Sequence, residues 1–262
     1  MVALGALHRG SVQLKQLLQF DALPSFQDFL HQPAPDHMHC VGGFDLPFGL
    51  PRAWVEAMQW PITWPECMDR YCAHSRDELR QLFKQFCDAR PAGAKFAHRM
   101  TDGPAGASPS MKWVNPPVAW MMHAGVPLLR NAAWTLPGLQ SGRANCVALE
   151  AYPGLLAREI LGHRSYKSDD KLKQTPDRFV ARKDILHALD LAQTRLALRL
   201  KLTASQHDTL LTDASGDSLD AVLCMVQAAW AVSQHDKAEA AGQTGHYGLP
   251  NFDPLEGWIV SA

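Results

Sequence analysis

Several familiar catalytic signals are missing from this chain of 262 residues. The sequence contains no G-x-x-x-x-G-K-[ST], G-x-G-x-x-G, H-E-x-x-H or G-x-S-x-G segment. This removes the common signatures of phosphate loops, dinucleotide folds, zinc proteases and α/β-hydrolases. The six cysteines include no C-x-x-C pair. We therefore expect reduced thiols in a folded interior rather than a disulfide framework.

Signals for membranes and secretion are also missing. No apolar run approaches the roughly 20 residues that span a bilayer, and the opening MVALGALHRG lacks the basic start and long apolar stretch of a signal peptide. The formal net charge is only −1, so any contact with nucleic acid must come from a local basic patch. These absences predict a soluble, cytoplasmic protein with no membrane partner.

What is present is an alternation of strand and helix patterns. Hydrophobic residues make up 47% of the chain and charged residues 19%, which is ordinary for a globular protein. Alternation predicts an α/β layered fold, in a single domain over residues 1–262 with a long insertion at about 60–145. The expected strands are a hairpin of 2–7 and 12–20, a buried strand at 40–44, and the segment CVALEAY.

Helices are expected where apolar residues recur at helical spacing. Ser75 and Glu78 predict a capping box before one of them, and Ser215 is the expected cap of the last long helix. The segment 33–37 breaks a short helix, and residues 91–117 are expected to form a long loop. The clearest helical segments are 75–91, 175–191 and 214–232.

Three aspartates precede the last apolar helix pattern. Asp213, Asp217 and Asp220 stand at i, i+4 and i+7, which is one face of a helix. Acidic residues suit the first turn of a helix because they meet the positive end of its dipole, and this explains Asp217 well. Asp220 directly precedes AVLCMVQAAWA, so it is expected to be buried and to need a partner or a metal.

Two further carboxylates end apolar strands. Asp45 follows CVGGF, and Glu150 follows CVAL. Either alone is more often a capping or turn residue, but ligands of open α/β sheets collect at the carboxyl ends of strands. Together with Asp217 and Asp220 they form a set of oxygen donors that suits a divalent cation such as Mg²⁺. Without such a cation, buried like charges would repel strongly.

The amino-acid sequence around these residues resembles that of a known family. The segments GGFDLPFGLPRAWVE, SPSMKWVNPPVAWM, LEAYPGLLAREILGHRSYKSDD and GDSLDAVLCMVQAAWA look like the domain-of-unknown-function family 429, over nearly the whole chain. That family is described as predicted nucleases with a ribonuclease H-like fold. The order FDLPFGLP, EAYP and DSLDA is fairly specific for it.

The resemblance implies a five-stranded mixed sheet flanked by helices, with one or two Mg²⁺ or Mn²⁺ ions held by carboxylates. Asp45 would match the acid of the fourth strand, and Asp217 and Asp220 the acids of the last helix. Glu150 would lie on the fifth strand, in or near the site, and is a candidate catalytic residue but not a metal ligand. Two such metals activate a water and stabilise the leaving oxygen of a phosphodiester.

One departure from the family bears on activity. Members usually begin with a strand ending in Gly-x-Asp, which supplies the central ligand, whereas MVALGAL looks like their second strand. The first central strand is therefore expected to be missing from this chain. A gene start assigned too late is favoured over a degenerate member, and in either case the chain as given is expected to be impaired or inactive.

Basic residues between these motifs are candidates for binding nucleic acid, either DNA or RNA. Lys95, Arg99, Lys112 and Lys167 lie in polar segments and would contact phosphates. An aromatic residue accompanies the lysine in KWVNPP and in SYKSDD, a combination that favours binding of single-stranded nucleic acid. The same aromatic residues would equally anchor these loops to the core. The leading hypothesis is a metal-dependent nuclease-like protein. The alternative is a non-catalytic nucleic-acid-binding or scaffold protein of the same fold.

Overall fold

The structure, a computed structural model, describes residues 1–32 and 38–262. The chain forms two compact units. The first unit comprises Met1–Leu23 and Ala151–Gly248 with Ser261, and the second comprises Pro24–Glu150 and Leu249–Val260 with Ala262. The insertion expected at about 60–145 falls entirely within the second unit. The helix break expected at 33–37 lies outside the described residues.

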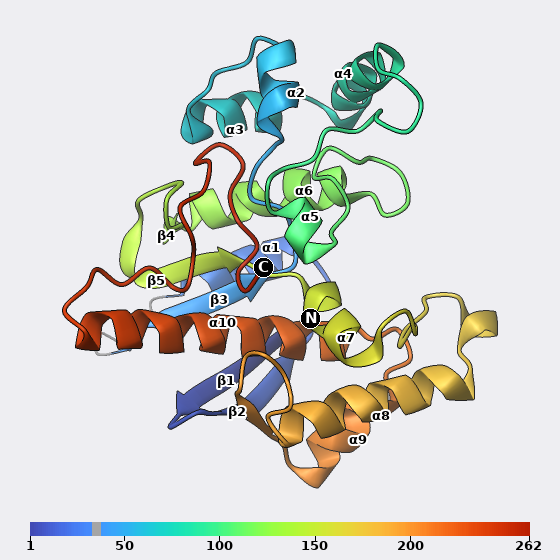
Figure 1. The fold of residues 1–262 in the computed structure, drawn as a ribbon, viewed down its shortest axis with the longest axis vertical. Helices are drawn as coiled ribbons and strands as arrows, with labels where there is room; N and C mark the ends of the chain where they lie inside the picture. Colours follow the sequence, from blue (N-terminus) through green and yellow to red (C-terminus); the bar gives the residue numbers. More distant parts are fainter. Residues whose placement is uncertain (33–37) are drawn as a thin grey trace. The chain divides into compact units, whose positions relative to one another are not determined.

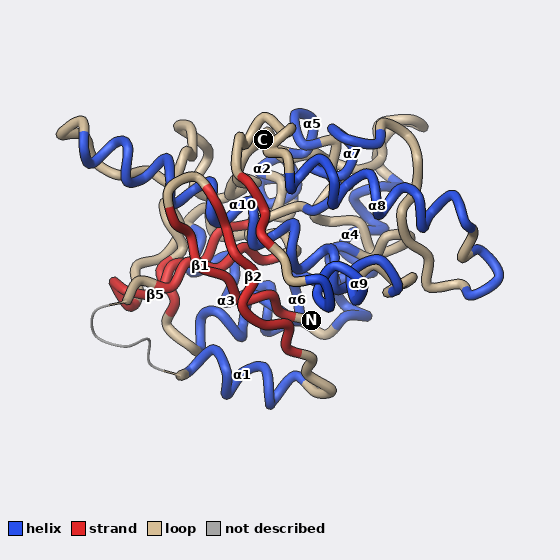
Figure 2. The backbone as a smooth tube through the Cα atoms, turned by 90° about the horizontal axis from the view of Figure 1, so that it is seen from below, coloured by secondary structure: helices blue, strands red, loops and turns tan. Residues whose placement is uncertain are grey.

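The sheet of the first unit is built on the expected hairpin. Strands β1 (Val2–His8) and β2 (Ser11–Leu18) are antiparallel, and Figure 2 shows them side by side. A third strand, β6 (Arg199–Lys201), pairs in parallel with β2. The two residues of the hairpin turn, Arg9 and Gly10, have φ angles of 44° and 74°. Positive φ at both central positions is the conformation that matches the twist of paired strands.

Helices pack on this sheet and bury its apolar residues. The longest, α10 (Asp217–Ala240), packs against β1 and β2 (Figure 1). Val12 and Leu14 of β2 share one hydrophobic core with Leu219 and Val222 of α10. The expected helix over 175–191 is confirmed as α8. The remaining helices of this unit are α7 (Pro153–Leu161), the short 3-10 helix η1 (Lys171–Lys173), α8 (Pro176–Asp190) and α9 (Ala204–Thr212).

The second unit has its own three-stranded sheet, and all its strands are parallel. β5 (Arg143–Glu150) is central, with β3 (Cys40–Phe44) on one side and β4 (Trp134–Thr135) on the other. Its helices are α1 (Leu23–His31), α2 (Arg52–Ala57), α3 (Trp64–Ala73), α4 (Arg76–Asp88), α5 (Asp102–Ala105) and α6 (Val118–Asn131).

Local sequence rules account for the helix that was most clearly expected, α4. The capping box is present, since the Glu78 N–H donates to Ser75 Oγ at 3.3 Å and the Ser75 N–H donates to Glu78 Oε2 at 2.7 Å. Leu79 and Phe83 of α4 are fully buried in the core of this unit. The long loop expected over 91–117 needs correction, because it contains the short helix α5.

The α/β class expected from the sequence is confirmed, because each unit contains a sheet with helices packed around it. The strands of the described residues form two three-stranded sheets instead of the single five-stranded sheet that the resemblance implies, and the ribonuclease H-like fold stays a prediction. None of the helices in the described part of the chain combines the length and the apolar composition that crossing a bilayer requires.

The hairpin turn offers a test of backbone conformation alone. A Cβ added at Gly10 would meet nothing within 4 Å, so Gly10→Ala changes only the cost of a positive φ. We expect a loss of about 1 kcal/mol in the free energy of unfolding, measured by urea denaturation. Gly103→Ala is the control, because a Cβ there also meets nothing and its φ is not positive. Equal effects of the two substitutions would contradict this account.

Candidate functional site

Only two of the three aspartates, Asp217 and Asp220, lie on α10. Asp213 lies before the helix, and its carboxylate accepts hydrogen bonds from the N–H groups of Ser215 at 3.1 Å and Ser218 at 2.8 Å. The expectation that Ser215 caps the helix is wrong, because Gly216, with φ 79°, occupies the cap position. Asp213 therefore shapes the turn into α10 instead of contributing to a helical face.

Asp220, one turn into α10, is a buried carboxylate with two partners from another segment. Its side chain accepts hydrogen bonds from the Tyr166 hydroxyl and the Lys167 ammonium, and the residue is only 8% exposed. Burial raises the pKa of Asp220 above its ordinary value, although Lys167 and Tyr166 both act to lower it. The expectation that Asp220 is buried and needs a partner is confirmed, and the partner is a cation of the chain itself.

Backbone geometry brings Lys167 to this position. A Cβ on Gly216 would lie 2.6 Å from Cβ of Lys167, so only glycine lets the two segments approach this closely. The Ser168 N–H also donates to the Ala214 carbonyl at 3.1 Å. The buried guanidinium of Arg182 supports the same segment by donating to the Tyr166 carbonyl at 2.7 Å.

Asp217 completes the acidic start of α10. It is exposed, it lies in the first turn of α10 with Asp220, and its charge raises the pKa of Asp220. The first unit therefore presents two carboxylates one helical turn apart, of which one is solvent-facing and the other is neutralised by Lys167. A pair of this kind can hold a cation or accept a proton.

The second unit places Asp45 and Glu150 at the carboxyl ends of neighbouring parallel strands, as the sequence predicts. Phe44, the last residue of β3, pairs in register with Glu150, the last residue of β5. Asp45 follows directly and is half-buried. The two strand ends thus lie together at one edge of this sheet.

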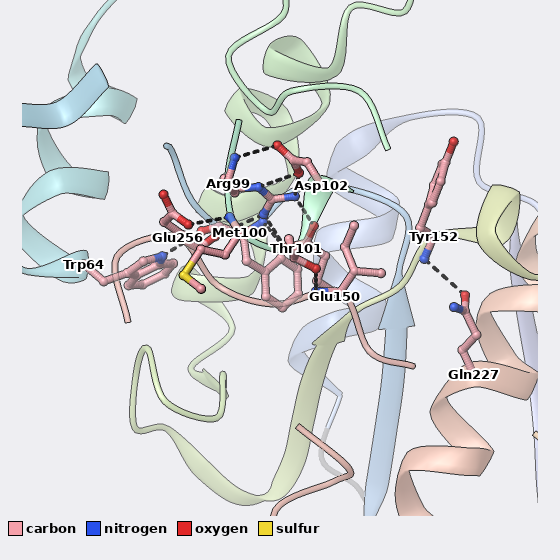
Figure 3. A network of polar contacts seen from close by, with 11 residues as sticks. Trp64, Arg99, Met100, Thr101, Asp102, Glu150, Tyr152, Gln227 and Glu256 are labelled. Atoms are coloured by element: carbon pink, nitrogen blue, oxygen red, sulfur yellow. Dashed lines mark hydrogen bonds and ion pairs between the residues drawn. The ribbon is translucent and has the colours of Figure 1, made fainter. Parts of the chain in front are cut away.

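Glu150 is held by an arginine that the sequence suggested for another role. Arg99 donates from Nη2 to Glu150 Oε1 at 2.7 Å and from Nη1 to Oε2 at 2.8 Å (Figure 3). The Phe48 N–H also donates to Oε2 at 2.9 Å. Glu150 is 3% exposed, so both of its oxygens are satisfied inside the protein.

Arg99 has a second acidic neighbour, Asp102, to which its Nε donates at 3.0 Å. Desolvation alone would lower the pKa of Arg99, but the carboxylates of Glu150 and Asp102 outweigh it and raise that pKa. Glu256 accepts from the N–H groups of Arg52 and Met100, each at 2.8 Å. We call Arg99, Asp102, Glu150 and Glu256 the buried clamp, because they join a loop, a strand end and the segment 249–260 within the second unit (Figure 3).

The four basic residues expected to bind nucleic acid occupy different environments. Lys95 is exposed, Lys112 is half-buried and Arg99 is buried, and all three belong to the second unit. Lys167 belongs to the first unit, and its side chain is 42% exposed beside Asp220. Tyr166 and Lys167 of the SYKSDD motif therefore both contact Asp220, a contact that sequence spacing did not predict.

The proposed metal ligands are divided between the units, with Asp217 and Asp220 in the first and Asp45 in the second. Within residues 1–32 and 38–262, no group of three or more His, Cys, Asp or Glu side chains is arranged to hold a metal ion. The polar partners that sequence reasoning missed, Arg52 with Asp253 and Glu256, carry no local signal because more than 200 positions separate Arg52 from each of them.

Comparisons with protein-family models, with curated proteins and with solved structures found no match to this chain. The resemblance noted in the sequence therefore stays a prediction, and the account of function that follows is built on the described contacts.

The role of Asp213 leads to a pH-dependent prediction. Although desolvation acts to raise it, the hydrogen bonds from Ser215 and Ser218 lower the pKa of Asp213 below its ordinary value of 3.8. Its stabilising effect is therefore complete above about pH 4 and is lost as the pH falls through the lower pKa of the folded state. We expect Asp213→Ala to cost about 1–2 kcal/mol at pH 7 and progressively less below pH 4.

Urea unfolding followed by circular dichroism at several pH values measures this effect. Asp208→Ala, which removes an exposed aspartate from α9 of the same unit, is the control and should change stability little. A cost for Asp213→Ala that stays constant down to pH 2 would contradict the assigned hydrogen bonds.

The buried clamp leads to a prediction about Arg99. Arg99→Met leaves Glu150 and Asp102 buried without their counter-charge, so we expect a loss of about 3–5 kcal/mol in the free energy of unfolding. Arg80→Met is the matched control, because Arg80 pairs with Asp77 at the surface, where such pairs contribute about 0–1 kcal/mol.

Tryptophan fluorescence during urea unfolding measures this difference, since all of the eight tryptophans except Trp230 lie in the second unit. If Arg99→Met were as mild as Arg80→Met, the buried clamp would not stabilise the unit, and Arg99 would again be a candidate for binding phosphate.

Proposed function

We propose that this chain is a metal-dependent nuclease-like protein directed at the phosphodiester bonds of nucleic acid, with Mg²⁺ or Mn²⁺ as the cofactor and with the impaired activity that its departure from the family implies. The observation that carries the proposal is the pair of carboxylates in the first turn of α10, the exposed Asp217 and the buried Asp220. The resemblance of DSLDA and its flanking residues to a family of predicted nucleases supports the same reading.

The donor set at the start of α10 fits a hard divalent cation. Mg²⁺ is commonly bound by one or two carboxylates, with water and substrate phosphates completing its shell. Asp217 and Asp220 supply two such carboxylates, and the exposed Asp217 gives solvent access to the pair. When bound, an ion of this kind activates a water molecule and neutralises the charge that develops on phosphoryl oxygens.

The side chains around this pair have assigned roles in the proposal. Asp217 and Asp220 would hold the ion, and the Tyr166 hydroxyl, which donates to Asp220, would orient that carboxylate. Lys167, whose side chain is 42% exposed, would contact a phosphate of the substrate. Asp45 and Glu150 belong to the second unit, where Glu150, held by Arg99, keeps the end of β5 in place.

A second function is favoured by one specific observation. Glu150 and Asp220 are each neutralised by a cation of the chain, Arg99 in one case and Lys167 in the other. A protein whose carboxylates are balanced internally can fold without a metal ion. The alternative proposal is accordingly a non-catalytic nucleic-acid-binding or scaffold protein, in which Lys95, Lys112 and Lys167 contact phosphates.

Titration calorimetry with Mn²⁺ separates these two functions. We expect the full chain to bind Mn²⁺ saturably. Asp217→Asn and Asp220→Asn should each weaken this binding about tenfold or more, and a tenfold change corresponds to about 1.4 kcal/mol. Asp208→Asn on α9 removes an equally charged but exposed side chain from the same unit and should leave binding unchanged. Equal weakening by Asp208→Asn would indicate a nonspecific effect of charge.

Hydrolysis assays on fluorescent single-stranded DNA and RNA complete the test. Cleavage that requires Mn²⁺ and is lost in Asp217→Asn supports the nuclease. Binding of either nucleic acid by a chain that binds no Mn²⁺ at millimolar concentration contradicts the nuclease and supports the non-catalytic alternative.

A further inference from the structure

Two cysteines from segments far apart in the sequence lie side by side on neighbouring strands of the second unit. Cys40 is the first residue of β3, and its register partner in the parallel strand β5 is Cys146. Register partners on neighbouring strands direct their side chains to the same face of the sheet, and the strands lie about 4.8 Å apart. Cys40 and Cys146 are therefore neighbours on the two strands, although 105 residues separate them in the chain.

The surroundings of Cys40 disfavour its ionisation. Desolvation raises the pKa of the Cys40 thiol, the charge of Cys146 raises it further, and Arg143 acts in the opposite direction. A raised pKa keeps the thiolate fraction of Cys40 small near neutral pH, so exchange at this cysteine is favoured under alkaline conditions.

The two thiols differ in access to solvent. Cys40 is exposed, whereas Cys146 is 1% exposed within the hydrophobic core of the unit. The other four cysteines, Cys67, Cys72, Cys87 and Cys224, lie outside β3 and β5. A reagent in solution therefore meets Cys40 first, and the thiol next to it across the strands is Cys146.

We propose that Cys40 and Cys146 form a redox-reactive pair that closes to an intramolecular disulfide on exchange with a low-molecular-weight disulfide. In the first step the Cys40 thiolate attacks the small disulfide, forms a mixed disulfide and releases one small thiol. In the second step the Cys146 thiolate attacks the Cys40 sulfur and releases the other small thiol. The two cysteines lose two electrons and two protons, which reduce the small disulfide to two thiols.

Sheet geometry makes this bond easy to reverse. The Cβ atoms of a relaxed disulfide lie about 3.8 Å apart, which is closer than the spacing of neighbouring strands. Closing the bond must draw β3 and β5 together at Cys40, and the resulting strain favours reduction. The cross-link is thus a reversible modification of the same strand pair whose opposite ends carry Asp45 and Glu150.

Peptide mapping of the native full chain tests the proposal. The protein is incubated with oxidised glutathione at pH 8.5, free thiols are blocked with N-ethylmaleimide in acid, and the chain is digested without reductant. Trypsin cleaves after Lys15, Arg52, Arg143 and Arg158, so Cys40 and Cys146 fall on separate peptides that contain no other cysteine. We expect a disulfide-linked pair of peptides 16–52 and 144–158, and the loss of two of the six free thiols.

Two variants make this result specific. Cys40→Ser changes an exposed residue and should abolish the linked pair, whereas Cys72→Ser, which changes a half-buried cysteine, should leave it unchanged. Excess dithiothreitol added to the folded protein should restore all six thiols. The proposal is overturned if Cys40 is recovered only as a mixed disulfide with glutathione, or if it is linked to a cysteine other than Cys146.

Discussion

The second unit depends on one guanidinium, that of Arg99, buried between the carboxylates of Glu150 and Asp102. A carboxylate without a partner in the interior would cost several kcal/mol, so each of these groups requires the others. Glu150 ends the central strand β5, Asp102 begins α5, and Arg99 also donates to the Glu256 carbonyl at 3.1 Å. The buried clamp therefore fixes three separate segments relative to one another within this unit.

The same physical requirement appears at the start of α10 in the first unit. There Asp220 is buried, and Lys167 and Tyr166 satisfy its carboxylate. The two environments differ in one respect that bears on function. Arg99 is enclosed, whereas the side chain of Lys167 is 42% exposed, so Lys167 can leave its carboxylate for another charged partner at a smaller cost in desolvation. The start of α10 is consequently the better candidate for exchanging a cation.

Local patterns were sufficient for much of the secondary structure. The hairpin, β3, α4 and α8 all follow from features within a few residues of one another: a turn glycine, an apolar run, a capping box and a proline in the first turn. The ends of β3 and β5 and the burial of Asp220 also followed from the local sequence. Asp45 and Glu150 were therefore placed correctly at the strand ends, and Asp220 near the start of α10. The patterns missed the role of Asp213, which a turn decides. They also missed α3 and α9, although each carries a local start signal, a proline in the first turn of α3 and a capping box of Thr203 and Gln206 in α9.

The sequence alone determined the α/β class, the acids at two strand ends and the burial of Asp220, because these depend on short-range periodicity and on the polarity of adjacent residues. Only the tertiary structure decided which charges meet. Arg99 was expected to bind phosphate and instead pairs with Glu150, 51 positions away, and Lys167 pairs with Asp220, 53 positions away. A buried charge requires an opposite charge nearby in space, and nothing in the local sequence specifies which distant residue will supply it.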